Sequence, residues 1–162
     1  MLNNAKDITY VNVGKVMVLS CDIDGDYLVH LCSEYWECLS QFKLAKERFI
    51  PRFIKFHHPS EQVLVLSESK DTHSPVICTE LLVSLYSIDG VFISDIRISI
   101  PAKFSPFERV KRIAVTKEGH IAMCDRKRIL LVYEYWPSWG TEKVSRKYQF
   151  CLILSESIIV CL

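Results

Sequence analysis

Short apolar runs, each followed by a tight polar turn, are the feature that most restricts the fold of this chain. Runs of roughly four to eight residues, rich in Val, Ile, Leu, Phe and Tyr, are typical of β-strands and are too short for most helices. The pattern predicts an all-β fold. The clearest runs are Val16–Cys21, Tyr27–Cys32, Val63–Ser67, Leu81–Ile88, Val91–Ile100, Arg112–Thr116, Ile121–Cys124, Ile129–Tyr135 and Tyr148–Leu154.

The turns between these runs predict antiparallel hairpins. Gly25, Gly90 and Gly119 each follow an acidic residue and stand between two runs. A short hairpin needs a positive φ at such a position, and glycine adopts it without strain. Links this short cannot carry a parallel crossover. We therefore expect consecutive antiparallel strands.

A strand–turn–strand phrase recurs, and its turns lie near residues 25, 60, 119 and 156. The mean interval is about 44 residues, close to the repeat of four-stranded propeller blades. An apolar run with aromatic residues follows each complete phrase as an expected third strand, at Tyr35–Phe42, Leu81–Ile88 and Ile129–Tyr135. We expect a single domain of antiparallel blades at 8–50, 51–103 and 104–147, with a partial blade at 148–162.

Residues 34–49 leave an alternative open. Tyr35, Leu39, Phe42, Ala45 and Phe49 follow a helical spacing, with Lys and Glu between them. The segment also occupies the position of a third strand in the repeat, so a strand competes with the helix. A helix here would indicate a small α+β domain that is not a propeller.

The overall composition excludes several classes of protein. The formal charge of +1 gives little attraction to phosphate, so nucleic acid is not expected as a partner. The 7 cysteines mostly lie in apolar runs and indicate core residues in a reducing cytosol, since no signal peptide opens the chain. None of the apolar stretches can span a bilayer. A cytoplasmic location is the expectation.

Motifs for catalysis, metals and cofactors are missing or incomplete. Asp22–Asp26 resembles the start of a calcium loop but lacks the later carboxylate, and a polar hairpin turn is the simpler interpretation. His57, His58, His73 and Cys78 lack the spacing of a zinc site. No nucleophile elbow or phosphate-binding loop is present. We expect no enzyme, cofactor, metal or small-molecule substrate; a hydrolase built on the same blades stays an alternative, since triads assemble from distant positions.

Two basic clusters and a tryptophan-rich segment are the candidate binding features. The clusters fall at the ends of two neighbouring expected strands. There they would bind an acidic peptide or an anionic membrane, or they would only prevent the sheet edge from pairing with another strand. Exposed tryptophans make contact hot spots, although packing between blades explains them equally well. The candidate binding residues are Arg109, Lys111, Arg112, Arg126, Lys127, Arg128, Trp136 and Trp139.

Several phrases resemble known propeller families. Ile54–Ser60 is similar to the strand and His/Pro/Ser turn of a WD repeat, and Leu85–Gly90 is similar to its strand-then-Gly ending. Ala114–Ile121 resembles the C-terminal propellers of BEACH-domain trafficking proteins, whereas Gly119–Ile129 resembles an NHL-repeat blade. The resemblance covers about residues 10–160, and the Trp-Asp and Gly-His signatures of WD repeats are missing from their usual places.

The resemblance implies a scaffold without an active site that binds other proteins through its rim loops, as part of a larger trafficking or adaptor protein. The NHL alternative implies a ubiquitin-ligase type of propeller that binds substrates or RNA. Fewer than four blades are visible, whereas complete propellers usually have about four to eight. We therefore expect a fragment or isoform that exposes apolar edges and self-associates.

Overall fold

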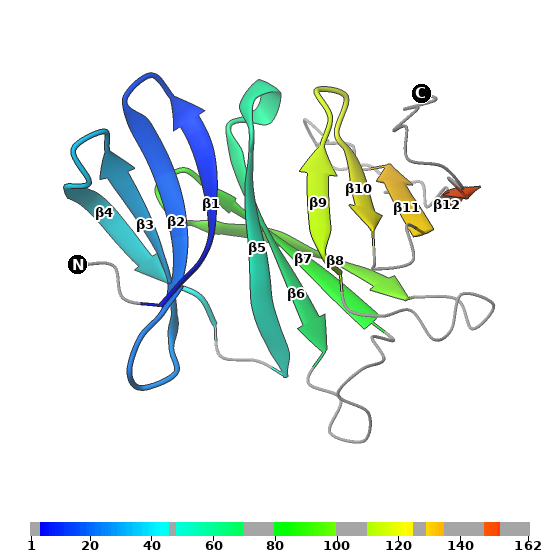
Figure 1. The fold of residues 1–162 in the computed structure, drawn as a ribbon, viewed down its shortest axis with the longest axis horizontal. Helices are drawn as coiled ribbons and strands as arrows, with labels where there is room; N and C mark the ends of the chain where they lie inside the picture. Colours follow the sequence, from blue (N-terminus) through cyan, green and yellow to red (C-terminus); the bar gives the residue numbers. More distant parts are fainter. Residues whose placement is uncertain are drawn as a thin grey trace.

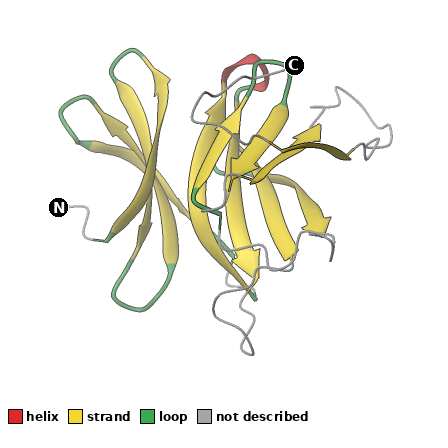
Figure 2. Cartoon of the chain, turned by 45° about the vertical axis from the view of Figure 1, so that its right-hand side comes forward, coloured by secondary structure: helices red, strands yellow, loops and turns green. Residues whose placement is uncertain are grey.

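Twelve strands in three antiparallel sheets make up the described part of the chain (Figure 1). The structure is a computed structural model, and it describes residues 4–45, 48–69, 80–99, 110–124, 129–134 and 148–152. Within these residues the fold is all-β, apart from a short 3-10 turn, η1 (His58–Ser60), drawn in red in Figure 2. The expected fold class is confirmed.

Each sheet is a meander in which consecutive strands pair. The first sheet has the order β1 (Ala5–Asn12), β2 (Lys15–Cys21), β3 (Tyr27–Ser33) and β4 (Cys38–Lys43). The second has the order β5 (Phe49–His57), β6 (Gln62–Ser69), β7 (Glu80–Ser87) and β8 (Phe92–Ser99). The third has the order β9 (Arg112–Val115), β10 (His120–Cys124), β11 (Ile129–Glu134) and β12 (Tyr148–Leu152).

Hairpin turns join the strands through residues with positive φ. Gly25, Gly90 and Gly119 have φ values of 77°, 84° and 88°, which confirms the conformation predicted for them. Trp36 in the β3–β4 turn and Glu61 after η1 also have positive φ, at 64° and 52°. A residue other than glycine can therefore fill this position, and the glycine pattern alone does not find every turn.

The assignment of strands to sheets corrects three expectations. The Gly25 turn joins β2 to β3, so the first hairpin of the first sheet turns at Gly14 instead. The third strand expected at Tyr35–Phe42 is wrong, because β4 is the fourth strand of its sheet. Because β4 is a strand, a helix over 38–43 is excluded as well. Tyr148–Leu152 pairs with β11 and closes the third sheet instead of opening a fourth blade; residues 153–162 lie outside the described part.

The second sheet lies between the other two, and its central strands β6 and β7 are buried on both faces. Side chains of successive residues in a strand point to opposite faces, so an unbroken apolar strand serves two interfaces. Val63 and Val65 of β6 pack with Met17 and the rest of the core between the first and second sheets. Leu64 and Leu66 pack in the core between the second and third sheets.

Polar side chains connect the sheets beside these cores. Asp7 Oδ2 in β1 accepts hydrogen bonds from the backbone N–H of Ile54 (2.9 Å) and from Lys55 Nζ (3.1 Å). The buried carboxylate of Glu68 pairs with Arg52 and accepts the N–H of Val110 at 2.9 Å, which joins the second sheet to the start of the third. The first strands β1, β5 and β9 thus lie next to one another (Figure 1).

Candidate functional site

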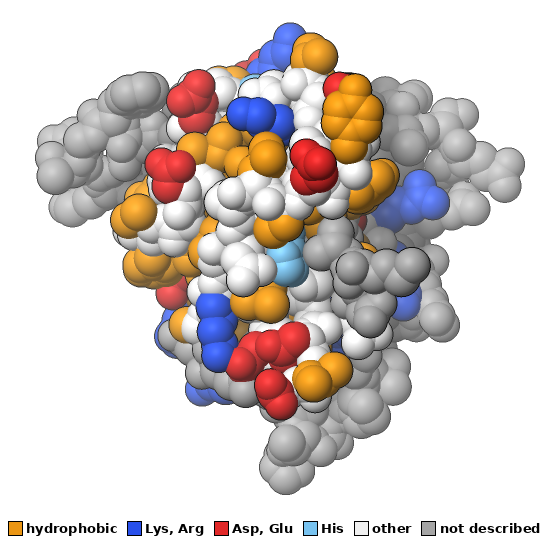
Figure 3. Space-filling view, turned by 90° about the vertical axis from the view of Figure 1, so that its left-hand side faces the viewer, with side chains coloured by type: hydrophobic (Ala, Val, Ile, Leu, Met, Phe, Trp, Pro, Cys, Tyr) orange, Lys and Arg blue, Asp and Glu red, His pale blue; other side chains and the backbone are white. Residues whose placement is uncertain are grey.

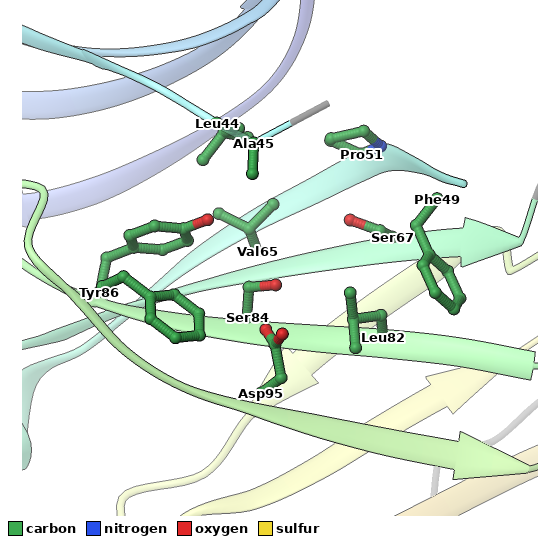
Figure 4. Close-up of a pocket in the computed structure, with 11 residues that line it drawn as sticks. Leu44, Ala45, Phe49, Pro51, Val65, Ser67, Leu82, Ser84, Tyr86 and Asp95 are labelled. Atoms are coloured by element: carbon green, nitrogen blue, oxygen red, sulfur yellow. The ribbon is translucent and has the colours of Figure 1, made fainter. Parts of the chain in front are cut away.

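A pocket of about 220 Å³ lies between the first and second sheets (Figure 4). Strands β6, β7 and β8 form its floor, the start of β5 forms one end, and the segment that follows β4 closes it from the side of the first sheet. Its walls are largely apolar, with Leu44, Pro51, Val65 and Leu82 among the lining residues.

Sheet register places the polar groups of this pocket side by side. Ser84 of β7 pairs with Asp95 of β8, and Tyr86 pairs with Phe92. Directly opposed side chains on one face lie about 4.5–5.5 Å apart at their Cβ atoms. In Figure 4 the Asp95 carboxylate points into the pocket beside the Ser84 hydroxyl. Ser67, opposite Leu82, adds a second hydroxyl to the lining.

Aromatic rings surround one end of the pocket. Tyr86 is buried, and its ring centroid lies 5.3 Å from that of Phe42 and 5.7 Å from that of Phe92. Phe92 itself remains 55% exposed and presents its ring at the rim. A partly exposed aromatic ring beside a carboxylate is an arrangement that can hold a cation, because the ring faces carry partial negative charge.

Two guanidinium groups lie over the ring of Phe49, which lines the pocket. The guanidinium carbons of Arg48 and Arg97 lie 5.5 Å and 6.0 Å from the centroid of the Phe49 ring. Arg48 also forms an ion pair with Glu80 at 3.0 Å. Arg48 and Arg97 do not themselves line the pocket, and the part of its lining around Asp95, the one carboxylate, is its acidic end.

A second polar group lies on the face of the first sheet that points away from the second. Ser20 Oγ is 2.8 Å from His30 Nε2, and His30 Nδ1 is 3.8 Å from Cys38 Sγ. Burial lowers the pKa of His30. A serine and a histidine in contact are two parts of a catalytic triad, but here a thiol stands where the triad has a carboxylate. Ser20 and His30 are only 4% and 8% exposed, which leaves little surface for a substrate.

The aspartates of the β2–β3 turn have a structural role. Asp22 Oδ1 accepts hydrogen bonds from the backbone N–H groups of Asp24 (3.0 Å) and Asp26 (2.7 Å), which is an Asx-type turn. Asp26 forms an ion pair with Lys43. No group of three or more His, Cys, Asp or Glu side chains within the described ranges is placed to hold a metal ion.

The structure describes two of the residues proposed for binding from the sequence. Lys111 and Arg112 are exposed at the start of β9 and do not line the pocket. The other six, Arg109, Arg126, Lys127, Arg128, Trp136 and Trp139, lie outside the described residues.

The pocket was not predicted from the sequence, although the chain carries a signal for it. Ser84 and Asp95 interrupt two successive apolar runs, and a hairpin pairing centred on Asp89-Gly90 brings these positions together. Of these two polar residues, Ser84 is buried, whereas Asp95 is exposed in the part of β8 beside the pocket.

Comparisons with known proteins give no identification, since neither a protein family nor a curated protein matches this chain. Among the described residues there is also no helix with the length and apolar character needed to cross a membrane.

Proposed function

We propose that this chain is a non-catalytic, cytoplasmic interaction scaffold of the WD-repeat propeller type, which binds other proteins through its hairpin loops and the pocket between its first two sheets. One observation carries the proposal: three successive four-stranded meanders are arranged with their first strands next to one another (Figure 1). Repeated sheets of this kind form rigid supports that present loops and inter-sheet pockets to partners.

Exposed apolar side chains at these places support the proposal. Val13 and Ile23, in two hairpin turns at the ends of the first sheet, are 91% and 96% exposed. Val91, Phe92 and Ile93 are exposed at the start of β8, beside the pocket. Covering large apolar side chains with a partner removes them from water and lowers the free energy, which favours association at these positions.

Site-specific photo-crosslinking in cells tests the scaffold role. A photoreactive phenylalanine analogue at Ile23 or at Phe92 should form a discrete adduct with a protein, and mass spectrometry would identify it. An excess of the unmodified chain should suppress this adduct, because a specific site can be saturated. If no adduct from either position is suppressed by the unmodified chain, the scaffold proposal is wrong.

A further inference from the structure

We propose that the acidic end of the pocket between the first and second sheets receives an arginine side chain of a partner protein. Asp95 (Figure 4) would pair with the guanidinium group while the rings of Tyr86 and Phe92 contact its planar face. The inference rests on the proposed scaffold function, and it names the chemistry by which one partner is recognised.

The negative charge of Asp95 favours a cation at the acidic end of the pocket. Asp95 is the one carboxylate among the described lining residues, and no ion pair or hydrogen bond of its side chain is found within the described part of the chain. The hydroxyl groups of Ser84, Ser67 and Tyr86 add oxygen acceptors to the same lining. A guanidinium group carries five N–H donors and no acceptor, so it matches a set of oxygens around one negative charge.

The size and walls of the pocket favour an arginine side chain over a larger ligand. The cavity of about 220 Å³ is smaller than the roughly 300–1,000 Å³ of sites for drug-sized molecules. A single side chain is a better match. Guanidinium is planar, weakly hydrated and able to stack on aromatic rings, whereas the ammonium group of lysine is compact and strongly hydrated. The partly apolar, aromatic walls therefore favour arginine.

Guanidinium groups already lie over one aromatic ring of the pocket lining. Arg48 and Arg97 both lie over the Phe49 ring. Phe92 offers a comparable ring at the acidic end, and the nearest guanidinium along its own strand, Arg97, is engaged with Phe49. The structure thus shows the proposed type of contact within this chain.

Arg97 is also the main charge that opposes the proposal. Asp95 and Arg97 are two residues apart on β8 and so lie on the same face of the strand. The positive charge of Arg97 should weaken the binding of a second cation nearby. This makes Arg97→Gln a useful variant, because it should change the affinity in the direction opposite to Asp95→Asn.

Titration of the whole chain with short peptides, followed by NMR amide shifts, tests the proposal. The probes are acetyl-Gly-Arg-Gly-amide and two matched peptides with citrulline or lysine in place of arginine. Citrulline has the shape of arginine but carries no charge. We expect saturable shifts at the amides of Ser84, Phe92 and Asp95 with the arginine peptide, weaker shifts with lysine, and none with citrulline.

Two variants make the result specific to the pocket. Asp95→Asn should weaken binding of the arginine peptide about tenfold or more, since a charge-assisted hydrogen bond is lost. The amide spectrum outside the pocket should stay unchanged. Arg97→Gln should strengthen binding. The proposal is overturned if citrulline shifts the same amides as strongly, or if no saturable shift occurs up to about 10 mM arginine peptide. Suppressible adducts in the crosslinking experiment combined with either outcome would leave the scaffold function standing and reject the arginine site.

Discussion

The backbone at Gly90, in the β7–β8 turn, lies directly against the Phe42 ring of the first sheet. Gly90 has a φ of 84°, and a Cβ at this residue would overlap the ring. Gly25 has a similar φ of 77°, but nothing lies within 4 Å of its Cβ position. The two glycines share the same backbone requirement and differ only in the contact between sheets.

Replacing each glycine by alanine should separate these two effects. Gly25→Ala should lower the free energy of unfolding by about 1–2 kcal/mol, the cost of a left-handed conformation. Gly90→Ala should lower it by a further 1–3 kcal/mol or so, because the added methyl group forces the two sheets apart. Urea denaturation of both variants gives the comparison. Equal losses would show that the Phe42 contact contributes little to stability.

His30 should make the stability of the chain depend on pH. Burial lowers the pKa of His30 in the folded state, so the unfolded chain binds the proton more readily. The contribution of His30 to stability is then fully present above the unfolded-state pKa of about 6.5. It is lost progressively as the pH decreases below that value. His30→Gln should flatten the dependence of the urea midpoint between pH 8 and pH 5.5, roughly one unit below the unfolded pKa. An unchanged slope would show that His30 does not cause the pH dependence.

At the scale of the elements, β1 is held against β5 by side chains that accept backbone N–H groups. Asp7 accepts the N–H of Ile54, and Thr9 Oγ1 accepts that of Phe56 at 3.1 Å. The carboxylate also pairs with Lys55 at 3.1 Å. These contacts replace the ladder hydrogen bonds that two strands of one sheet would form, because β1 and β5 belong to different sheets.

Removing the Asp7 carboxylate should weaken this connection. Asp7→Ala leaves the Ile54 N–H and the Lys55 ammonium without their partner, and we expect a loss of about 1–3 kcal/mol in the free energy of unfolding. Asp7→Asn should cost less, since the amide oxygen still accepts a hydrogen bond. The neighbouring exposed Lys6→Ala serves as control and should change stability by less than about 0.5 kcal/mol. A loss no larger than that of the control would show that packing alone joins the sheets.

For the molecule as a whole, no other sheet of the described residues covers the outer face of the first sheet, which exposes Ile8 and Tyr10 although Val18 is only 2% exposed (Figure 3). Val16 and Val18 lie on this face, opposite Tyr10 and Ile8 of β1. In the second sheet the corresponding Val63 and Val65 lie opposite Phe56 and Ile54, and there the first sheet covers them. The outer face thus has the apolar pattern of a face that packs against another sheet.

The isolated chain should therefore self-associate. Ile8 and Tyr10 are 46% and 55% exposed on this face. The double variant Ile8→Ser, Tyr10→Ser should raise the dissociation constant about tenfold or more in sedimentation equilibrium, because less apolar surface is removed from water. Ile23→Ser, in an exposed hairpin turn, is the control and should change it little. A stable monomer of the unmodified chain would contradict the prediction.

The sequence by itself determined the strands and most of their turns. Alternation of side chains and the conformation of hairpin glycines depend on neighbouring residues, so runs such as Tyr27–Cys32 and turns such as that at Gly90 could be read locally. The sheet to which each strand belongs could not. β1 was missed because Asp7 and Thr9, which accept backbone N–H groups of β5, interrupt its apolar pattern. Without β1, the strands of the first sheet were counted one position too early.

Tertiary structure decided the pocket. Ser84 and Asp95 are brought together by one hairpin, but the pocket exists only because the segment after β4 and the start of β5 pack over that hairpin from another part of the chain. Such packing depends on contacts between residues far apart in sequence, and the local pattern does not specify which of these residues meet. The strands are therefore a local property of the sequence, whereas their grouping into sheets and the site between them depend on the folded chain.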